Sequence, residues 1–478
     1  MAKPNIIFIL IDDMGWTDLG CFGSSFYETP NIDRLASEGM RFTDAYAACP
    51  VCSPSRASYM CGKYPAAIGV TDWIDHDRVL HPQRGILIDA PYIDHLPMSE
   101  KSVASALRDG GYATWHVGKW HLGDLPYYPQ NHGFDVNLGG CKRGTPGKGY
   151  FSPYGIDGFA DGPDGEYLTD RLTDEAVNLI KRHDYSKPFF LNMCHYAVHE
   201  PIQVKAADRE RFEKKRIALG LDKLNFSEEG EVFPNAPKNN PYKIRRRLFQ
   251  SDAGYAAMVF NLDENIGRLM DAVKNAGQEN NTIVVFTSDN GGVAATEIVH
   301  FTDGQCHHIT EMPTCNKPLS QGKGWMYEGG VREPLIVKWP GIVKPGTECG
   351  TPVTSPDFYP TFLQAAGLPL LPKQHRDGVS IMPLLTGAEG FDREAVYWHY
   401  PHYGNQGGSP AASVRKGDYK LIEFYEDNSL ELYNLIEDIG ELNNLANTLP
   451  DIVSDLHGLL CRWRDSAGAL YPQKNPDW

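Results

Sequence analysis

The chain has 478 residues, of which 41% are hydrophobic and 11% aromatic, so it can bury a large core and is expected to form two domains. Its 45 basic and 61 acidic residues give a formal net charge of −16. This charge argues against a nucleic-acid-binding protein and requires a local basic pocket for any anionic ligand. No run of about 18 apolar residues is present, so no membrane insertion is expected.

The N-terminal segment predicts a buried strand rather than a targeting signal. The apolar run from Ile6 to Ile11 is short and is followed directly by two aspartates, unlike a signal peptide. We therefore expect a cytoplasmic location for the chain as it stands, or a periplasmic or secreted location if a signal peptide has been removed. The ten cysteines lack regular spacing and predict no disulfide framework.

Apolar runs and helical periodicity alternate along the chain up to residue 339. Strands are expected at 4–11, 112–117, 188–196, 281–288 and 334–339, and helices at 31–39, 99–107, 172–183 and 253–276. This alternation predicts an α/β fold with a mostly parallel sheet covered by helices on both faces. Ligands of such sheets bind at the carboxyl ends of the strands.

A second domain is expected at residues 374–478, after a catalytic domain of residues 1–373. Short strands are predicted at 395–399, 413–415, 419–424 and 430–433, followed by a helix at 451–466. Together they predict a small antiparallel sheet with one helix. The aromatic segment 398–403 is expected to be exposed, which would let His399 and His402 reach a sugar, whereas Trp398 is expected to pack in the core.

Two pairs of polar residues follow predicted strands directly. Asp12-Asp13 follows the first strand, and Asp289-Asn290 follows the strand that ends at Ser288. Either pair alone favours a helix cap or a turn. Two such pairs at two strand ends instead favour a shared site. Three carboxylates and an amide oxygen suit Ca²⁺ or Mg²⁺ better than zinc.

The segment Cys52-Ser-Pro-Ser-Arg56, with Gly62 six residues later, is the most informative stretch of the chain. Pro54 fits the first turn of a helix, which places Cys52 at the helix N-terminus, where an anion is favoured. Cys49 and Cys52 also form a C-x-x-C pair, which is compatible with a redox or structural role. The Pro-Ser-Arg sequence that follows makes this alternative weaker, because a redox pair does not need it.

Three further segments carry cations and histidines after predicted strands. The turn at 117–123, Val-Gly-Lys-Trp-His-Leu-Gly, projects Lys119 and His121 together. The turn at 197–201 contains His199, whereas His195 is expected inside the preceding strand and is left out of the site. The segment 318–332 contains Lys323 between two glycines, which allow the backbone to approach a ligand closely.

These motifs together resemble those of the type I sulfatases, within the alkaline-phosphatase-like superfamily. The resembling elements are C-x-P-S-R, G-K-W-H-L-G, A-x-H-x-P and P-L-x-x-G-K-G-x-x-Y-E-G-G-x-R, and they occur in family order over residues 4–340. The chain departs from the family only mildly, with Met60-Cys61 where Leu-Thr is common. The resemblance implies an α/β/α sandwich with a small C-terminal α+β subdomain.

In this family the motif cysteine is oxidised to formylglycine by a modifying enzyme, which the resemblance implies as a partner. The hydrated aldehyde attacks the sulfate ester, forms a covalent sulfate and expels it again. Cys52 would be this nucleophile and a metal ligand. The metal, Ca²⁺ or alternatively Mg²⁺, would be bound in addition by the strand-end residues Asp12, Asp13, Asp289 and Asn290.

The resemblance also assigns the cationic and acid–base roles. Arg56 would stabilise the formylglycine hydrate, Lys119 would bridge it to the sulfate, and His121 would take the hydroxyl proton. His199 and Lys323 would contact the sulfate. A sugar alkoxide is too basic to leave unprotonated, so one of these two must act as the acid, with His199 the first choice.

The chain looks like a bacterial carbohydrate sulfatase that takes part in polysaccharide degradation. Its charge of −16 would repel a highly sulfated polymer, so we expect exo-action on a sulfated mono- or oligosaccharide, preferably of galactose type. The segment 139–167 is expected to lie at the mouth of the site. The charged segment 203–247 is expected to be mainly a solvated insertion.

Three other functions remain open from the sequence. The first is a phosphonate or phosphate monoester hydrolase of the same superfold, or an arylsulfatase of broad specificity. The second is a non-enzymatic protein that binds sulfated glycans. The third is the redox protein indicated by Cys49 and Cys52.

Overall fold

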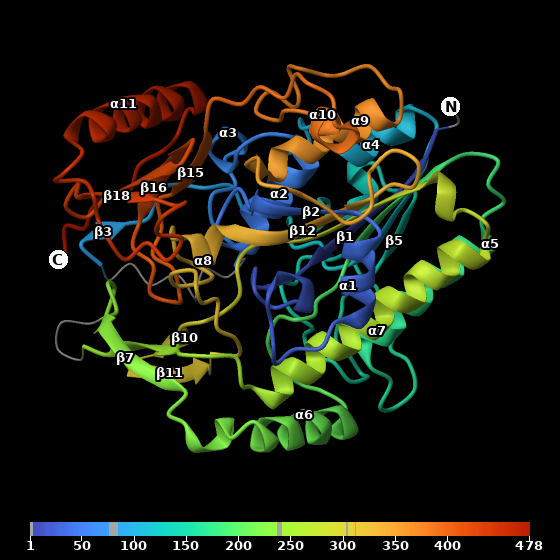
Figure 1. Ribbon diagram of the computed structural model, residues 1–478, viewed down its shortest axis with the longest axis horizontal. Coiled ribbons are helices and arrows are strands. Elements are labelled where there is room, and N and C mark those ends of the chain that lie inside the picture. Colours follow the sequence, from blue (N-terminus) through green and yellow to red (C-terminus); the bar gives the residue numbers. More distant parts are fainter. Residues whose placement is uncertain (1–2, 76–84, 237–240, 303–304, 311) are drawn as a thin grey trace.

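A large, mostly parallel sheet forms the centre of the molecule (Figure 1). The computed structural model describes residues 3–75, 85–236, 241–302, 305–310 and 312–478. The strands of the sheet run in the order β13-β2-β12-β9-β1-β6-β4-β5, with β14 paired to β2. Their bounds are β1 Asn5–Ile11, β2 Met40–Tyr46, β4 Ala113–Gly118, β5 Val136–Leu138, β6 Phe189–Cys194, β9 Thr282–Ser288, β12 Arg332–Lys338, β13 Thr347–Cys349 and β14 Val353–Thr354.

The directions of the strands confirm the predicted sheet. β1 pairs in parallel with both β6 and β9, and β4 pairs in parallel with β5 and β6. β12 runs antiparallel to its neighbours β9 and β2. Since β1, β9, β4 and β6 all point the same way, the segments that follow them gather at one edge of the sheet.

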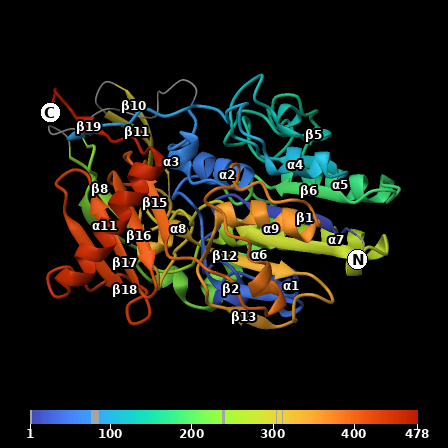
Figure 2. The same cartoon turned by 90° about the horizontal axis from the view of Figure 1, so that it is seen from above.

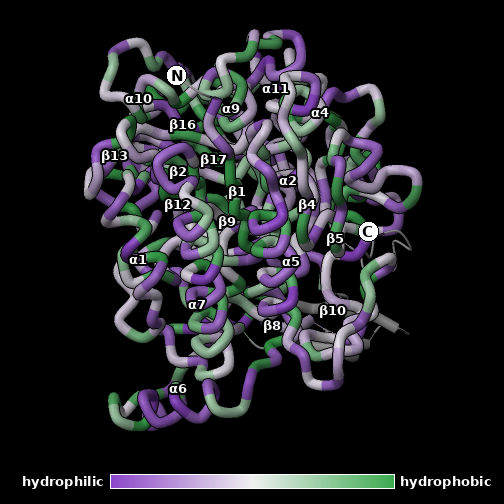
Figure 3. The backbone as a smooth tube through the Cα atoms, turned by 90° about the vertical axis from the view of Figure 1, so that its right-hand side faces the viewer, coloured by the Kyte–Doolittle hydropathy of each residue, from purple (hydrophilic) through white to green (hydrophobic). Residues whose placement is uncertain are grey.

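Helices cover both faces of the sheet because β1 alternates its side chains between two cores (Figure 2). Ile7 and Ile9 pack with the helices on one face, and Ile6 and Phe8 with those on the other. The first face carries α1 Pro30–Ser37, α5 Leu168–Arg182 and α7 Ala253–Asn275; the second carries α2 Cys52–Cys61, α4 Val103–Asp109 and α9 Phe358–Ala365. In Figure 3 the strands β1 and β9 are hydrophobic and lie inside the molecule.

A small antiparallel sheet and a long helix form the C-terminal part, as predicted. The sheet has the order β15-β16-β17-β18. One of its faces packs on α11, and the other packs on Tyr46 and Val331 of the first part. The bounds are β15 Val396–Tyr400, β16 Ala411–Lys416, β17 Tyr419–Phe424, β18 Leu430–Asn434 and α11 Pro450–Ala467. The predicted domain boundary at 373/374 stays a prediction; Ile381 and Leu385 beyond it pack in the core of the larger sheet.

The remaining elements lie in the connections. The described parts of the charged segment 203–247 contain a helix followed by two paired antiparallel strands. The helices are α3 Pro65–Ile68, α6 Ala206–Ala218, α8 Glu328–Val331 and α10 Met382–Thr386, and the strands are β3 Leu87–Ile88, β7 Ser227–Val232, β8 Lys243–Arg247, β10 Glu297–Thr302, β11 Gln305–Thr310 and β19 Gln473–Lys474. Short 3-10 helices occupy Gly20–Phe22, Pro129–His132, Leu221–Lys223, Glu279–Asn281 and Ser355–Asp357.

Several details differ from the sequence prediction, and two of them concern α4 and β2. The helix expected at 99–107 begins only at Val103, because Ser102 caps it by accepting a hydrogen bond from the Ser105 N–H. Strand β2 is not predicted at all. None of the described helices is both long and apolar enough to cross a bilayer.

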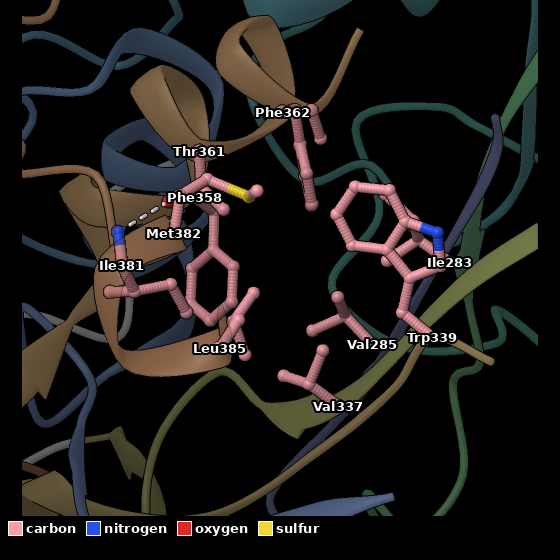
Figure 4. Close-up of a pocket in the computed structure, with 11 residues that line it drawn as sticks. Ile283, Val285, Val337, Trp339, Phe358, Thr361, Phe362, Ile381, Met382 and Leu385 are labelled. Carbon is pink, nitrogen blue, oxygen red and sulfur yellow. Dashed lines mark hydrogen bonds between the residues drawn. The ribbon is translucent and has the colours of Figure 1, made fainter. Parts of the chain in front are cut away.

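A small cavity between α9, α10 and the sheet is part of the core (Figure 4). It is lined mainly by apolar side chains such as Val285, Val337 and Phe358. The Thr361 hydroxyl on its wall already accepts a hydrogen bond from the Ile381 N–H at 3.0 Å. Such a lining offers nothing to bind an anion, so the functional site lies elsewhere.

Candidate active site

Three carboxylates meet where β1 and β9 end. The Asp13 N–H donates to Asp289 Oδ1 at 3.2 Å, which joins the two strand ends. Asp12, Asp13 and Asp289 each offer one oxygen, these oxygens lie within 4.8 Å of one another, and all three residues are buried. The parallel pairing of β1 with β9 therefore brings the two predicted pairs together.

The fourth predicted metal ligand, Asn290, lies in the same cluster. Its Nδ2 donates to Asp13 Oδ1 at 2.8 Å, while its Oδ1 is buried and has no hydrogen-bond partner among the described residues. A buried amide oxygen without a partner costs about 1–3 kcal/mol. A hard divalent cation would satisfy this oxygen, and three carboxylates with one amide oxygen are a donor set that Ca²⁺ prefers.

Three buried cations pair with the three carboxylates. Lys119 Nζ lies 2.8 and 2.7 Å from the two oxygens of Asp12. The other two pairs are Arg56 Nε with Asp289 Oδ2 at 2.8 Å and Lys323 Nζ with Asp13 Oδ2 at 2.8 Å. A chain of net charge −16 thus concentrates three cations in one buried place. A metal on the carboxylates would leave the three cations as a surplus of positive charge for an anion.

Cys52 begins α2, as the sequence predicts, and faces His121. Its Sγ lies 3.3 Å from His121 Nδ1, and burial raises the pKa of the thiol. A buried, protonated thiol is a poor nucleophile. Cys49 is also buried, with a thiol pKa raised well above its usual value, and both cysteines are free. Redox-active cysteines have lowered pKa values, so the surroundings of this pair argue against the redox alternative.

The tautomer of His121 follows from its partners. Its Nε2 lies 2.8 Å from the carbonyl oxygen of Ile74, an acceptor only, so Nε2 carries the proton and donates. Burial first, and Lys119 second, hold the pKa of His121 well below its usual range. The unprotonated Nδ1 of a neutral ring therefore faces the side chain of residue 52, which is the arrangement of a general base.

His199 and Lys323 form a contact pair on the other side of Asp13. His199 Nδ1 donates to the Glu200 carbonyl at 2.9 Å, so Nε2 is left as an acceptor, and it lies 3.1 Å from Lys323 Nζ. Burial, followed by the charge of Lys323, lowers the pKa of His199 to about 3. The proton between these two residues is therefore on Lys323.

Close backbone approaches hold these side chains at one edge of the sheet. The Lys119 N–H donates to the Cys194 carbonyl, which ties the turn after β4 to the end of β6. The Lys323 N–H donates to the Gly292 carbonyl. A Cβ on Gly322 would lie 2.3 Å from that same carbonyl oxygen, so the backbone can approach this closely only with glycine there.

The segment 139–167 contacts both histidine turns, in agreement with its expected place. A Cβ on Gly144 would lie 2.6 Å from Cε1 of His121. The Tyr150 hydroxyl lies 2.6 Å from the Tyr196 carbonyl and 2.8 Å from the His199 carbonyl. Tyr150 and the Ile74 carbonyl thus orient site residues, and no motif in the sequence points to either of them.

The prediction that segment 398–403 is exposed is wrong. Trp398 packs in the core as expected, but His399 and His402 are also buried, because β15 lies against the first part of the chain. His402 Nε2 lies 3.0 Å from Thr71 Oγ1. The complete burial of the His402 side chain argues against the predicted contact with a sugar.

Comparisons with known proteins agree with this geometry. Residues 4–368 match the family model described as Sulfatase, and residues 321–465 match the model described as N-sulphoglucosamine sulphohydrolase, C-terminal. The chain is 31% identical to a sulfatase from Formosa agariphila, over 96% of this chain and 88% of that protein. It is also 31% identical to the N-acetylgalactosamine-6-sulfatase of Mus musculus, over 90% of this chain and 73% of that protein. The crystal structure of Ps i-CgsB in complex with k-i-k-neocarrahexaose has a TM-score of 0.75 at 29% identity, covering 97% of this chain and 93% of that chain.

Proposed function

Because this chain belongs to the sulfatase family and is therefore a sulfuric ester hydrolase, we propose that it removes a sulfate group from a carbohydrate, with Cys52 converted to formylglycine. The observation that carries the proposal is the position of the residue 52 side chain: it faces a neutral His121 and lies within the electrostatic influence of three buried cations that pair with the neighbouring carboxylates. A protonated thiol in this position cannot attack sulfur, whereas the hydrated aldehyde of formylglycine supplies a hydroxyl nucleophile.

Residues around position 52 would hold the anion and move the proton. Lys119 and Lys323 would bind the sulfate, and Arg56 would stabilise the residue 52 side chain from the Asp289 side. His121 Nδ1 would accept a proton from the hydroxyl, since its Nε2 is fixed on Ile74. Asp12, Asp13, Asp289 and Asn290 would hold Ca²⁺, or alternatively Mg²⁺, and the metal supplies Lewis-acid polarisation of the sulfate.

The proton for the leaving alcohol would come from the pair of His199 and Lys323. His199 is neutral with a pKa of about 3, so it can act as an acid only after it receives a proton. Lys323 Nζ, 3.1 Å from Nε2, is the adjacent source. We therefore propose that the two residues act as one acid: Lys323 holds the proton, and His199 Nε2 positions it until the alkoxide develops.

The substrate we propose is a sulfated mono- or oligosaccharide of galactose type, attacked from its end. The similarity to an N-acetylgalactosamine-6-sulfatase and to Ps i-CgsB in complex with a neocarrahexaose supports a sulfated carbohydrate. The charge of −16 disfavours a highly sulfated polymer. A location outside the cytoplasm and modification by a formylglycine-generating enzyme belong to the same proposal.

Rates on matched substrates test the function. We expect nitrophenyl sulfate to be turned over much faster than nitrophenyl phosphate or a phosphonate monoester, and a sulfated galactose-type oligosaccharide faster than its intact polymer. A preference for the phosphorus esters would establish the phosphonate or phosphate hydrolase instead. Faster sulfate release from the interior of the polymer would contradict exo-action, and binding without any turnover would indicate a glycan-binding protein.

A further inference from the structure

His402, for which the sequence predicts a sugar contact, lies instead in a buried cluster outside the site of Cys52. The cluster consists of Asp72, Asp89 and His402. Asp72 and His402 are buried completely, and the side chain of Asp89 is 15% exposed. The three residues come from separate parts of the chain: Asp72 follows α3, Asp89 follows β3, and His402 follows β15.

The ring of His402 is held with Nδ1 towards the two carboxylates. Its Nε2 is engaged with Thr71 Oγ1 at 3.0 Å, which fixes the orientation of the ring. Nδ1 lies 3.5 Å from Asp89 Oδ1 and 3.7 Å from Asp72 Oδ2, and it has no hydrogen-bond partner among the described residues. A buried ring nitrogen without a hydrogen bond is costly, by about 1–3 kcal/mol. Its position towards the carboxylates needs an explanation.

An ion pair between imidazolium and carboxylate does not fit these separations. Charge-assisted N–H···O bonds are about 2.7–2.9 Å long, so nothing in such a pair would keep the atoms at 3.5 and 3.7 Å. The separations are instead close to those of donors that share a metal ion, with the 3.5 Å distance inside and the 3.7 Å distance just beyond the range expected for a tetrahedral site. With metal–donor distances of about 2.0–2.2 Å, neighbouring ligands of a tetrahedron lie roughly 3.3–3.6 Å apart.

The surroundings of the cluster are those that orient metal ligands. Asp72 Oδ1 accepts hydrogen bonds from the Tyr400 hydroxyl at 3.0 Å and from the Trp73 N–H at 2.8 Å. These bonds turn Asp72 Oδ2 towards His402. Metal-binding histidines and carboxylates commonly have their second atom fixed by such outer partners, as Nε2 of His402 is fixed by Thr71.

We propose that Asp72, Asp89 and His402 bind a divalent transition-metal ion of the zinc class. One imidazole nitrogen and two carboxylate oxygens suit Zn²⁺, whereas the oxygen-only donor set of Asp12, Asp13, Asp289 and Asn290 suits Ca²⁺. The chain would thus carry two metal sites of different selectivity. The three donors leave a fourth position for water or another ligand.

The ion would fasten the C-terminal part to the catalytic part beside the active site. His402 follows a strand of the smaller sheet, whereas Asp72 is two residues from Ile74, whose carbonyl orients His121. An ion that fixes Asp72 would therefore also fix the segment that sets the tautomer of His121. This inference concerns folding and metal content and does not depend on the proposed substrate.

Metal titration of the full chain tests the site. The protein is stripped with a chelator, returned to Ca²⁺ so that the oxygen site is filled, and titrated with Co²⁺, which reports nitrogen and oxygen ligation by visible absorption. We expect about one equivalent of Co²⁺ to bind and Zn²⁺ to displace it, with a rise in melting temperature on addition of either metal. His402→Gln should abolish the absorption band and the rise.

Two further variants keep the result interpretable. Asp89→Asn changes the partly exposed ligand, and it should also lose the band; this covers the case in which His402→Gln does not fold. His457→Gln removes a partly exposed histidine 3.2 Å from Glu423 and should keep the full stoichiometry. Absence of a Co²⁺ band in the wild-type protein, or an equal band in both the His402→Gln and Asp89→Asn proteins, would overturn the proposal.

Discussion

Nδ1 of His121 lies 3.3 Å from Sγ of Cys52, and the opposite nitrogen of the ring is fixed on the Ile74 carbonyl at 2.8 Å. The helix that begins at Cys52 and the turn after β4 are far apart in the sequence, yet they place an unprotonated ring nitrogen next to the side chain that we propose as the nucleophile. The unprotonated nitrogen is thus directed at residue 52 before any substrate is bound. Such preorganisation is what general-base catalysis requires.

Replacing Cys52 by alanine should abolish turnover and leave the fold intact. The reacting group would be lost, while the helix start tolerates alanine with a loss of only about 1 kcal/mol. Peptide mass analysis of the active wild-type protein should show residue 52 as an aldehyde. Cys49→Ala is the matched control, since it removes the neighbouring buried thiol and should keep most of the activity. Full activity of a protein whose Cys52 is entirely unmodified would refute the mechanism.

Replacing His199 by glutamine should slow poor leaving groups more than good ones. A sugar alkoxide needs protonation and a nitrophenolate does not, so we expect a loss of roughly 10²–10⁴-fold in kcat on a sugar sulfate and a much smaller loss on nitrophenyl sulfate. Lys323→Met should show the same leaving-group dependence, together with a raised KM, because Lys323 is also proposed to bind the sulfate. Equal losses on both substrates would show that the pair binds the anion only.

The alternation of strands and helices and the positions of the motifs could be predicted from local sequence, because apolar runs and strand-end aspartates are local features. Strand β2 could not. Its sequence contains Arg41, Thr43 and Asp44, which resemble a loop, and Asp44 is tolerated there because Arg332 and Arg415 pair with it from distant segments. The burial of His402 was equally hidden, since it depends on Thr71, far away in the sequence.

Removing the metal should lower both activity and stability. If Asp12, Asp13, Asp289 and Asn290 bind Ca²⁺ in the folded state only, a free concentration a hundred times Kd adds about 2.7 kcal/mol to the free energy of unfolding. A chelator should therefore lower the melting temperature of the wild-type protein, and added Ca²⁺ should restore it. In the Asn290→Ala variant, the change in melting temperature on adding Ca²⁺ should be smaller. An unchanged melting temperature in the chelated wild-type protein would contradict a metal at this site.

Replacing Lys420 by methionine should destabilise the junction with the C-terminal sheet. Lys420 Nζ lies 2.9 Å from Glu328 Oε1 and 2.9 Å from Glu441 Oε1, and all three side chains are buried. Leaving buried carboxylates without this partner should cost about 3–5 kcal/mol in urea unfolding. Lys416→Met is the control: this lysine, at the end of the neighbouring strand β16, pairs with Glu394 at the surface, where such pairs contribute about 0–1 kcal/mol. Similar losses in both variants would refute the buried network as the cause.

His116 should make the protein less stable as the pH falls. It is buried between the Gly118 carbonyl and Asn192, and burial lowers its pKa to about 3, below the roughly 6.5 of an unfolded chain. Below pH 6.5 the unfolded state therefore binds a proton that the folded state does not, so stability is complete above this pH and is lost progressively towards pH 3.

Between pH 6.5 and 5 this difference amounts to about 2 kcal/mol for His116 alone. His116→Gln will lower the free energy of unfolding at every pH, because the packing changes. As the pH is lowered from 6.5 to 5, however, the free energy of unfolding of this variant should decrease by about 2 kcal/mol less than that of the wild type. Urea titrations of both proteins at several pH values measure the two slopes. Parallel curves would mean that His116 is protonated in the folded protein and that its burial does not control the acid sensitivity.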